Sequence, residues 1–105
     1  MKYFAIMSTD VADSLSLRKT ARGDHLERLH ELDRQGRLLI AGPHPLTDEN
    51  DPQSPAFTGS LVVASFASLE SAQAWAAVDP YVDAGVYADV TVKPFLPVLP
   101  TKKAP

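Results

Sequence analysis

The sequence contains no cysteine, no cluster of basic residues and no apolar run long enough to span a membrane. The absence of cysteine excludes disulfides, thiolate nucleophiles and cysteine-ligated metal sites. Lysine and arginine (10 residues) are outnumbered by aspartate and glutamate (13) and are scattered, whereas nucleic-acid binding depends on concentrated positive charge. We therefore expect no nucleic-acid partner. With no long apolar segment and no targeting signal at the N-terminus, we also expect no membrane partner and a cytoplasmic location.

The chain of 105 residues is short enough that we expect a single hydrophobic core. Its hydrophobic content of 45% and charged content of 22% are ordinary for a globular domain. A core of this size is thin, and small domains often gain stability by forming oligomers.

Apolar runs and turn residues predict six elements. We expect strands at 2–8, 37–41, 58–66 and 86–95, and helices at 17–35 and 69–78. Gly36 is placed to end the first helix, which we expect to be irregular or broken near Gly23, and Ser68 is placed to cap the second. Gly42 and Pro43 should stop the second strand. We expect an exposed loop at 44–57, which carries three acids and three prolines, and an extended, proline-containing tail after Leu96.

The element order β-α-β-β-α-β predicts a ferredoxin-like α+β sandwich, in which two helices cover one face of a four-stranded sheet. Three of the strands are apolar on both faces, which is typical of strands covered on both sides. We therefore expect a homodimer whose sheets pack face to face, because a bare second face would be a large exposed apolar patch. The alternative is that the tail, through Phe95, Leu96, Val98 and Leu99, folds back over its own sheet.

Candidate chemistry centres on His25 and Asp79. At 100° per residue His25 falls on the apolar stripe of the first helix, with Arg22 one turn before it, whereas Arg28 falls on the polar side. Asp79 falls on the inner side of the second helix, at an Asp-Pro stop. Histidine can transfer protons near neutral pH, and a carboxylate can orient it. Arg22 could hold an anionic group of a substrate. The alternative is a packed histidine beside an aspartate that only ends a helix.

Other residue patterns give weaker indications of a functional site. His25 and His30 point to different sides of a helix and do not form a metal-binding pair, and His44 lies in an expected loop without other ligands nearby. No glycine-rich phosphate cradle follows a strand, and Ser60 lacks the flanking pattern of a nucleophile elbow. Tyr81 is expected to pack in the core or line a pocket beside Asp79. The residues therefore favour acid–base chemistry without a cofactor, a metal or a covalent intermediate.

Five segments, taken in their order and spacing, resemble the YCII-related family. They are Arg-Gly-Asp-His-Leu at 22–26, Gly-Arg-Leu-Leu-Ile-Ala-Gly-Pro at 36–43, Phe-Thr-Gly-Ser at 57–60, Asp-Pro-Tyr-Val-Asp-Ala-Gly-Val-Tyr at 79–87, and Val-Lys-Pro-Phe at 92–95. The resemblance implies a family domain over residues 1–96, a separate tail at 97–105 and a dimeric α+β barrel. It also implies an active site on the family's histidine and aspartate, here His25 and Asp79.

Members of this family are similar in fold to muconolactone isomerases, and some are dehydrochlorinases or lactone dehalogenases. The resemblance thus implies an enzyme of lyase or isomerase type. Together with the residue patterns, it leads us to expect a small cyclic, anionic substrate, with Arg22, Ser60 and Tyr81 as substrate contacts. Two alternatives remain: a protein that binds a small molecule without turnover, and a dimeric scaffold in which the contact between His25 and Asp79 is only structural.

Overall fold

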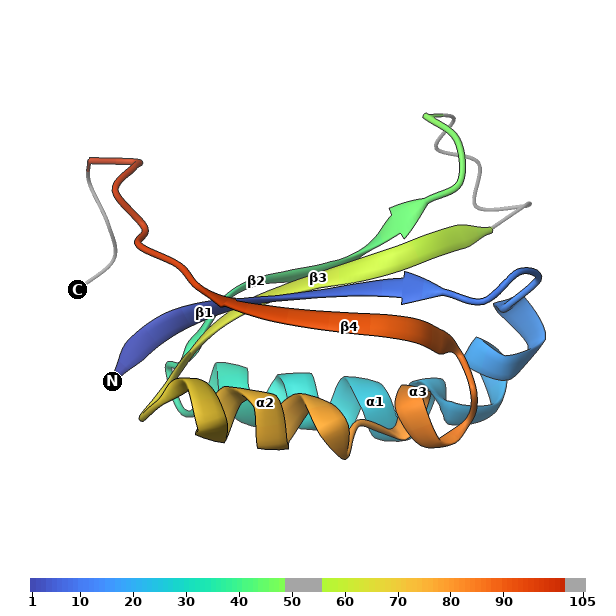
Figure 1. The fold of residues 1–105 in the computed structure, drawn as a ribbon, viewed down its shortest axis with the longest axis horizontal. Coiled ribbons are helices and arrows are strands. Elements are labelled where there is room, and N and C mark those ends of the chain that lie inside the picture. The colour runs from blue at the N-terminus through green and yellow to red at the C-terminus, as the bar shows by residue number, and fades with distance from the viewer. Residues whose placement is uncertain (49–55, 102–105) are drawn as a thin grey trace.

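The computed structural model describes residues 1–48 and 56–101, which form four strands and three helices (Figure 1). In chain order the elements are β1 (Lys2–Asp10), α1 (Leu15–Arg34), β2 (Leu38–Pro45), β3 (Phe57–Phe66), α2 (Leu69–Ala77), α3 (Pro80–Asp83) and β4 (Tyr87–Pro94). The strands form one antiparallel sheet in the order β2-β3-β1-β4. This is the ferredoxin-like α+β arrangement that the element order predicts.

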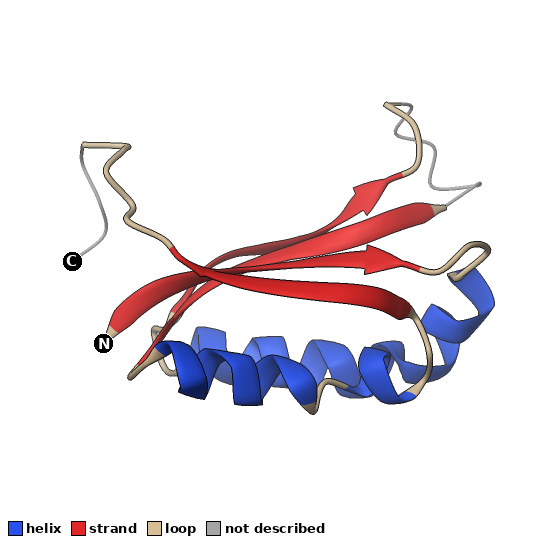
Figure 2. Ribbon diagram, viewed as in Figure 1, coloured by secondary structure: helices blue, strands red, loops and turns tan. Residues whose placement is uncertain are grey.

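All three helices lie on one face of the sheet, and the other face carries none of the described helices (Figure 2). The strand register explains which side chains meet the helices. Ile6 of β1 pairs with Val62 of β3 and Val92 of β4, and side chains of paired residues share a face. No helix in the described ranges combines the length and the apolarity that crossing a bilayer requires.

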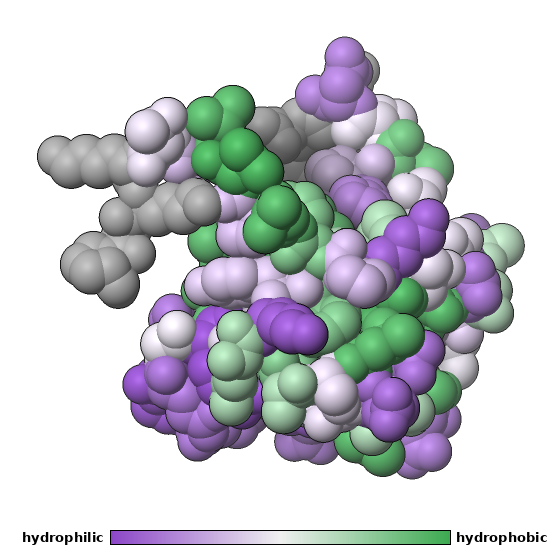
Figure 3. Space-filling view, turned by 60° about the vertical axis from the view of Figure 1, so that its left-hand side comes forward, coloured by the Kyte–Doolittle hydropathy of each residue, from purple (hydrophilic) through white to green (hydrophobic). Residues whose placement is uncertain are grey.

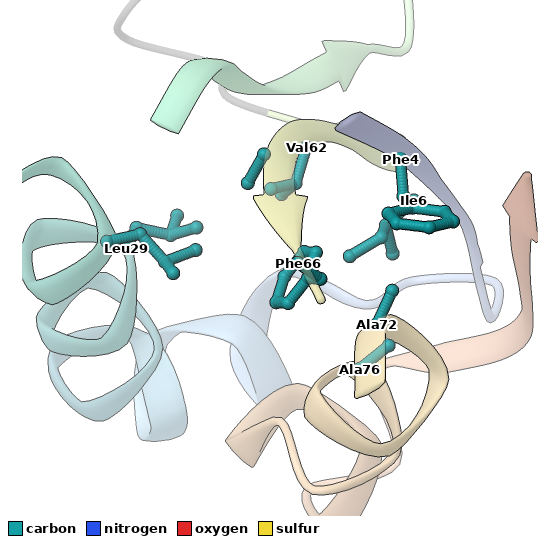
Figure 4. Close-up of a cluster of buried hydrophobic side chains, with 9 residues drawn as sticks. Phe4, Ile6, Leu29, Val62, Phe66, Ala72 and Ala76 are labelled. Carbon is teal, nitrogen blue, oxygen red and sulfur yellow. The ribbon is translucent and has the colours of Figure 1, made fainter. Parts of the chain in front are cut away.

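The main core lies between the sheet and the two long helices. Figure 4 shows Leu29 of α1 pointing toward Val62 and Phe66 of β3, with Ala72 and Ala76 of α2 closing the cluster from below. Small residues on α2 allow that helix to approach the sheet closely, and Phe66 is 2% exposed. Burying a side chain of this size stabilises the fold by about 2–3 kcal/mol.

The first helix is longer and more regular than the sequence suggests. It begins at Leu15 rather than Leu17 and runs through Gly23 without a break. A mid-helix glycine costs about 1 kcal/mol relative to alanine, which the packing of Leu29 and Leu32 against the sheet offsets. Gly36 follows the helix with φ +70°, as predicted for a residue in the left-handed conformation that ends helices. Ser68 caps α2 by accepting a hydrogen bond from the backbone N–H of Ser71, also as predicted.

The prediction that Gly42 and Pro43 stop the second strand is wrong, because β2 continues to Pro45. β2 is an edge strand, and proline is tolerated there when its missing N–H would face away from the sheet. The predicted loop is correspondingly shorter: His44 and Pro45 belong to β2 and Phe57 to β3, while residues 49–55 lie outside the described part. The other strands differ from prediction by one or two residues at their ends.

The short helix α3 is absent from the sequence-based prediction, and it changes the position of Asp79. α2 ends at Ala77, so Asp79 does not lie on the inner stripe of that helix as predicted. Asp79 instead caps α3, where its carboxylate accepts the backbone N–H of Tyr81 at 2.9 Å. The chain then turns at Gly85 (φ +79°), and the N–H of Val86 donates to the carbonyl of Tyr81. Four residues give too little periodicity for a helix to be recognised from sequence.

The tail does not cover the bare face of its own sheet. Its four apolar side chains are all exposed: Phe95 (43%), Leu96 (80%), Val98 (64%) and Leu99 (72%). In Figure 1 the tail leaves the sheet on the side away from the helices. Figure 3 shows hydrophobic atoms gathered on that protruding part of the surface. The alternative in which these residues fold back over the sheet is therefore wrong for the described tail, which ends at Thr101.

Candidate active site

A pocket of about 440 Å³ lies between α1 and the β2–β3 part of the sheet. This volume is within the usual range of small-molecule sites. Its basic lining comes from α1, its phenylalanine and tyrosine come from β3 and α3, and its apolar walls come from both layers. The lining residues are Leu15, Arg18, Lys19, Arg22, His25, Leu26 and Leu29 of α1, Ala41, Gly42 and Pro43 of β2, Phe57, Ser60 and Val62 of β3, and Tyr81 of α3.

The two residues predicted to form a pair are in contact. Nδ1 of His25 lies 2.8 Å from Oδ1 and 3.0 Å from Oδ2 of Asp79. Both side chains are buried, at 9% and 5% exposure. His25 comes from the middle of α1 and Asp79 from the start of α3, so the contact joins two helices that cover the same end of the sheet.

The contact determines which imidazole nitrogen is available for chemistry. Asp79 also accepts hydrogen bonds from the Tyr81 N–H and from Nη1 of Arg28 at 3.2 Å, so its oxygens act as acceptors throughout. Nδ1 of His25 must then be the donor, which leaves the lone pair of the neutral ring on Nε2. Nε2 bonds to no described residue, and no buried side-chain nitrogen or oxygen of the described chain lacks a partner. Nε2 therefore reaches the pocket that His25 lines.

Arg28 is a partner of Asp79 that the sequence pattern did not indicate. It was expected on the polar side of α1, yet its guanidinium stacks 4.1 Å from the Trp75 ring centre and donates to the Trp75 carbonyl at 2.7 Å. A long side chain at the edge of a helix can reach a neighbouring helix even when its Cβ points partly to solvent. Arg28 therefore shares the carboxylate of Asp79 with His25.

Tyr81 forms one wall beside His25. The two rings are stacked with centres 3.9 Å apart and planes 11° apart, and Tyr87 meets Tyr81 edge-on at 5.6 Å. Burial raises the pKa of Tyr81, while the charges of Arg18 and Arg22 oppose that rise. At neutral pH its hydroxyl therefore remains protonated and can donate a hydrogen bond.

Arg18 lines the end of the pocket nearest the start of α1, and the sequence pattern did not indicate it as a site residue. Nε and Nη2 of Arg18 bind the carboxylate of Asp10 at 2.7 and 3.0 Å, and both side chains are almost fully buried. Nη2 also donates to the Gly59 carbonyl and to Oγ of Ser60, at 3.1 and 3.0 Å. Burial alone would lower the pKa of Arg18, but the hydrogen bond and charge of Asp10 outweigh it and raise that pKa.

The predicted substrate contacts all line the same pocket. Ser60 is buried at its floor, Tyr81 forms a wall, and Arg22 is exposed among the lining residues. Arg18 could have been found from sequence, because it lies four residues before Arg22 and seven before His25 on one helix face. Its partner Asp10 gave no such signal, since it lies beyond the predicted strand at 2–8, at the end of β1.

Metal ligands are not gathered in the described residues: no three His, Asp or Glu side chains there lie close enough together to hold an ion. His30 is exposed, and His44 lies at the far end of β2.

Comparison with known proteins adds a family and a fold. The YCII-related domain matches residues 1–96. Protein YciI of Escherichia coli O6:H1 and that of Shigella flexneri are each 58% identical over 92 residues, which cover 88% of this chain and 94% of theirs. An uncharacterized protein of Haemophilus influenzae is 50% identical over 93 residues, covering 89% of this chain and 95% of its own.

Among solved structures, the fold resembles 5-chloro-2-hydroxyhydroquinone dehydrochlorinase of Burkholderia phenoliruptrix in complex with 2,5-dihydroxybenzoquinone. The TM-score is 0.79 at 23% identity, over 90% of this chain and 93% of that one. This likeness supports the ferredoxin-like, dimeric α+β barrel class of fold. With a family match over nearly the whole described chain and relatives at 50–58% identity, the protein belongs to the YCII-related family.

Proposed function

We infer that the protein is a cofactor-free enzyme of lyase or isomerase type, in which His25 transfers a proton of a small cyclic substrate and Asp79 holds His25 in position. The contact of His25 Nδ1 with Asp79, 2.8 Å long and buried, carries this proposal, because it leaves Nε2 as a base at the wall of a pocket. A carboxylate in this position also stabilises the imidazolium that forms when the base accepts a proton.

The proposed step is proton abstraction next to a carbonyl. Nε2 of His25 accepts the proton, the C–H electron pair forms a C=C bond, and the carbonyl π pair moves onto oxygen as an enolate. In an isomerase a C=C bond of the substrate is conjugated with the enolate, so the imidazolium returns its proton to a more distant carbon and the double bond shifts. In a lyase the enolate electrons return and expel a leaving anion from a neighbouring carbon, and the imidazolium later releases its proton to solvent.

The pocket lining supports an anionic cyclic substrate. Arg18, Lys19 and Arg22 are basic, no lining residue is acidic, and the remaining walls are largely apolar. We propose Arg22, Ser60 and Tyr81 as substrate contacts. The structurally similar dehydrochlorinase was solved with a dihydroxybenzoquinone, a ligand of this size and type, which favours the same class here.

Proton transfer can be tested before the natural substrate is known. We expect the wild-type protein to catalyse exchange of carbon-bound hydrogen for deuterium in some members of a panel of cyclic enolisable ketones and hydroxyquinones in D₂O, measured by NMR. His25→Ala should reduce that exchange to the buffer rate while its melting temperature remains close to that of the wild type. A panel member that binds without exchange or turnover would instead indicate a binding protein.

We also propose that the protein acts as a homodimer through the sheet face opposite the helices. On that face Ala5 and Ile40 flank Val63, and Met7 pairs with Leu61. Ala5 and Val63 are buried between their neighbours, Met7 and Leu61 are half-buried, and Ile40 is exposed. Ile40 is 58% exposed, and an apolar surface of this kind is typical of an interface. In this proposal residues 1–96 are the functional domain, and residues 97–105 are a separate tail.

A further inference from the structure

Arg18 has a donor that its protein partners do not use. Nε and Nη2 make four hydrogen bonds, to Asp10, Gly59 and Ser60, whereas Nη1 makes none of comparable length to the described chain. The hydroxyl of Tyr81 lies near enough to the guanidinium for a weak hydrogen bond that opposes the rise of the Tyr81 pKa. No buried side-chain nitrogen of the described residues lacks a partner, so Nη1 must touch space that solvent can enter. Because Arg18 is only 6% exposed and lines the pocket, that space is the pocket.

The hydroxyl of Tyr81 is in the same situation. Tyr81 is 2% exposed, and its Oη donates a hydrogen bond to none of the residues described. By the same reasoning the hydroxyl opens into the pocket that the residue lines. The guanidinium carbon of Arg18 lies 5.1 Å from the centre of the Tyr81 ring, so the two unused donors belong to one corner.

Ser60 supplies a third donor there. Its Oγ accepts hydrogen bonds from Nη2 of Arg18 at 3.0 Å and from the hydroxyl of Tyr87 at 3.1 Å. A serine hydroxyl has two acceptor positions and one hydrogen, and both acceptor positions are now occupied. The Ser60 hydrogen is therefore left to donate, and Ser60 lines the pocket.

We propose that Arg18, Ser60 and Tyr81 form an oxyanion subsite, which binds an ionised oxygen carried by the ring of the ligand. The subsite rests on the proposed function, since it would hold the oxygen of the enolate while His25 takes the proton. It selects ligands with a phenolate, an enolate or a ring carboxylate. Preorganised donors aimed at a developing negative charge are commonly the largest single contribution to catalysis.

The surroundings favour an anion over a neutral acceptor. Asp10 balances the charge of Arg18 and fixes the orientation of its planar guanidinium group, so this group need not move when a ligand binds. Lys19 and Arg22, also in the lining, add positive charge that none of the lining residues balances. The stacking of Tyr81 on His25 places the subsite next to the proposed base, within reach of one small ring.

The direct test is Tyr81→Phe, which keeps the ring and removes a hydroxyl whose hydrogen no described residue accepts. The probes are 2,5-dihydroxybenzoquinone, which is an anion at neutral pH, and its neutral dimethyl ether. By calorimetry, the wild type should bind the anion at least about tenfold more tightly than the ether, and Tyr81→Phe should weaken anion binding about tenfold. The melting temperature should not change.

Arg18→Lys provides a second test that keeps a positive charge opposite Asp10. A lysine ammonium lacks the several in-plane donors of a guanidinium and cannot hydrogen-bond to Asp10, Ser60 and the ligand together. Anion binding should therefore again weaken about tenfold or more. Arg34→Gln, at an exposed arginine of the same helix, is the matched control and should bind like the wild type. Circular dichroism identifies any variant that fails to fold, and in that case Tyr81→Phe decides.

The subsite is refuted if the wild type binds neither probe up to millimolar concentration, binds both equally, or loses nothing on Tyr81→Phe. Failure of the proposed function looks different. Anion binding that depends on Tyr81 and Arg18, together with exchange that does not depend on His25, would keep the subsite and remove the proposed catalytic role.

Discussion

The imidazole of His25 lies flat on the ring of Tyr81, with centres 3.9 Å apart, and both residues are tied to one carboxylate. Asp79 accepts Nδ1–H of His25 and the backbone N–H of Tyr81, the second as the cap of α3. A single residue thus sets the tautomer of the histidine and the position of the ring that supports it. The short helix α3 is the element that makes this arrangement possible.

Replacing Asp79 by asparagine should separate the electrostatic role of this residue from its role as a helix cap. Asparagine caps helices as well as aspartate does, so α3 should persist, at a cost of about 1–3 kcal/mol in the free energy of unfolding. Proton exchange should fall by about two to four orders of magnitude, because the amide neither fixes the tautomer nor stabilises an imidazolium. Asp83→Asn, at an exposed acid in α3, is the control. Undiminished exchange in the Asp79→Asn variant would reduce Asp79 to a structural residue.

Breaking the buried ion pair of Asp10 and Arg18 should lower the free energy of unfolding far more than breaking an ion pair at the surface. Asp10→Asn leaves a buried guanidinium without its counter-charge, and we expect a loss of about 3–5 kcal/mol in the free energy of unfolding, measured by urea denaturation. The exposed pair of Arg34 and Glu27 provides the comparison, and Glu27→Gln should cost far less, because water and salt screen exposed charges. Equal losses at the two sites would contradict the proposed rigidity of Arg18.

The buried hydroxyl of Tyr87 should make the protein less stable at high pH. Burial raises the pKa of its hydroxyl to about 12. Between its ordinary value of about 10 and this value, the hydroxyl ionises in the unfolded chain but keeps its proton in the folded one. The unfolded state then binds fewer protons, so the free energy of unfolding is undiminished below about pH 10 and decreases as the pH rises toward 12.

Tyr87→Phe tests this assignment. The variant should lose about 1 kcal/mol at neutral pH, because the hydrogen bond to Ser60 is gone, and should show a flatter decline above about pH 10. Urea denaturation at a series of pH values measures both quantities. A decline as steep as that of the wild type would assign the pH dependence to other groups.

The proposed dimer predicts a contrast between two exposed apolar residues. Ile40→Asp, on the open sheet face, should give a monomer in light scattering, because a charge would be buried at the interface. Val78→Asp, at a site 71% exposed at the end of α2, should leave the association unchanged. A wild-type protein that is monomeric at micromolar concentration would rule out the dimer itself.

Much of the architecture follows from local pattern. Alternation and apolar runs identify the four strands, and the stripe on α1 correctly turns His25 and Leu29 inward. The pairing of His25 with Asp79 was predicted by placing both residues on inner positions of two helices that must cover the same sheet, and this placement holds for His25. The reason given for Asp79 was wrong, since it caps α3 rather than facing inward from α2.

The features that could not be predicted depend on tertiary contact. Pro43 is typical of a strand end, and only the edge position of β2 makes it acceptable within the strand. Arg28 has the position of a solvent-facing residue, and only the nearby end of α2 and the cap of α3 provide Trp75 and Asp79 as partners. Asp10 and Arg18 are eight residues apart across a turn, a spacing that no helix or strand period links.

The proposed proton transfer requires that His25 presents an unprotonated Nε2 to the pocket while Asp79 accepts the hydrogen bond from Nδ1–H. Nitrogen-15 NMR of histidine-labelled protein at mildly alkaline pH measures this directly. We predict that the His25 signals show a protonated Nδ1 and an unprotonated Nε2, and that the Nε2 signal moves when 2,5-dihydroxybenzoquinone is added. A protonated Nε2 with a bare Nδ1, or an Nε2 signal that no pocket ligand moves, would contradict the proposal that His25 is the base.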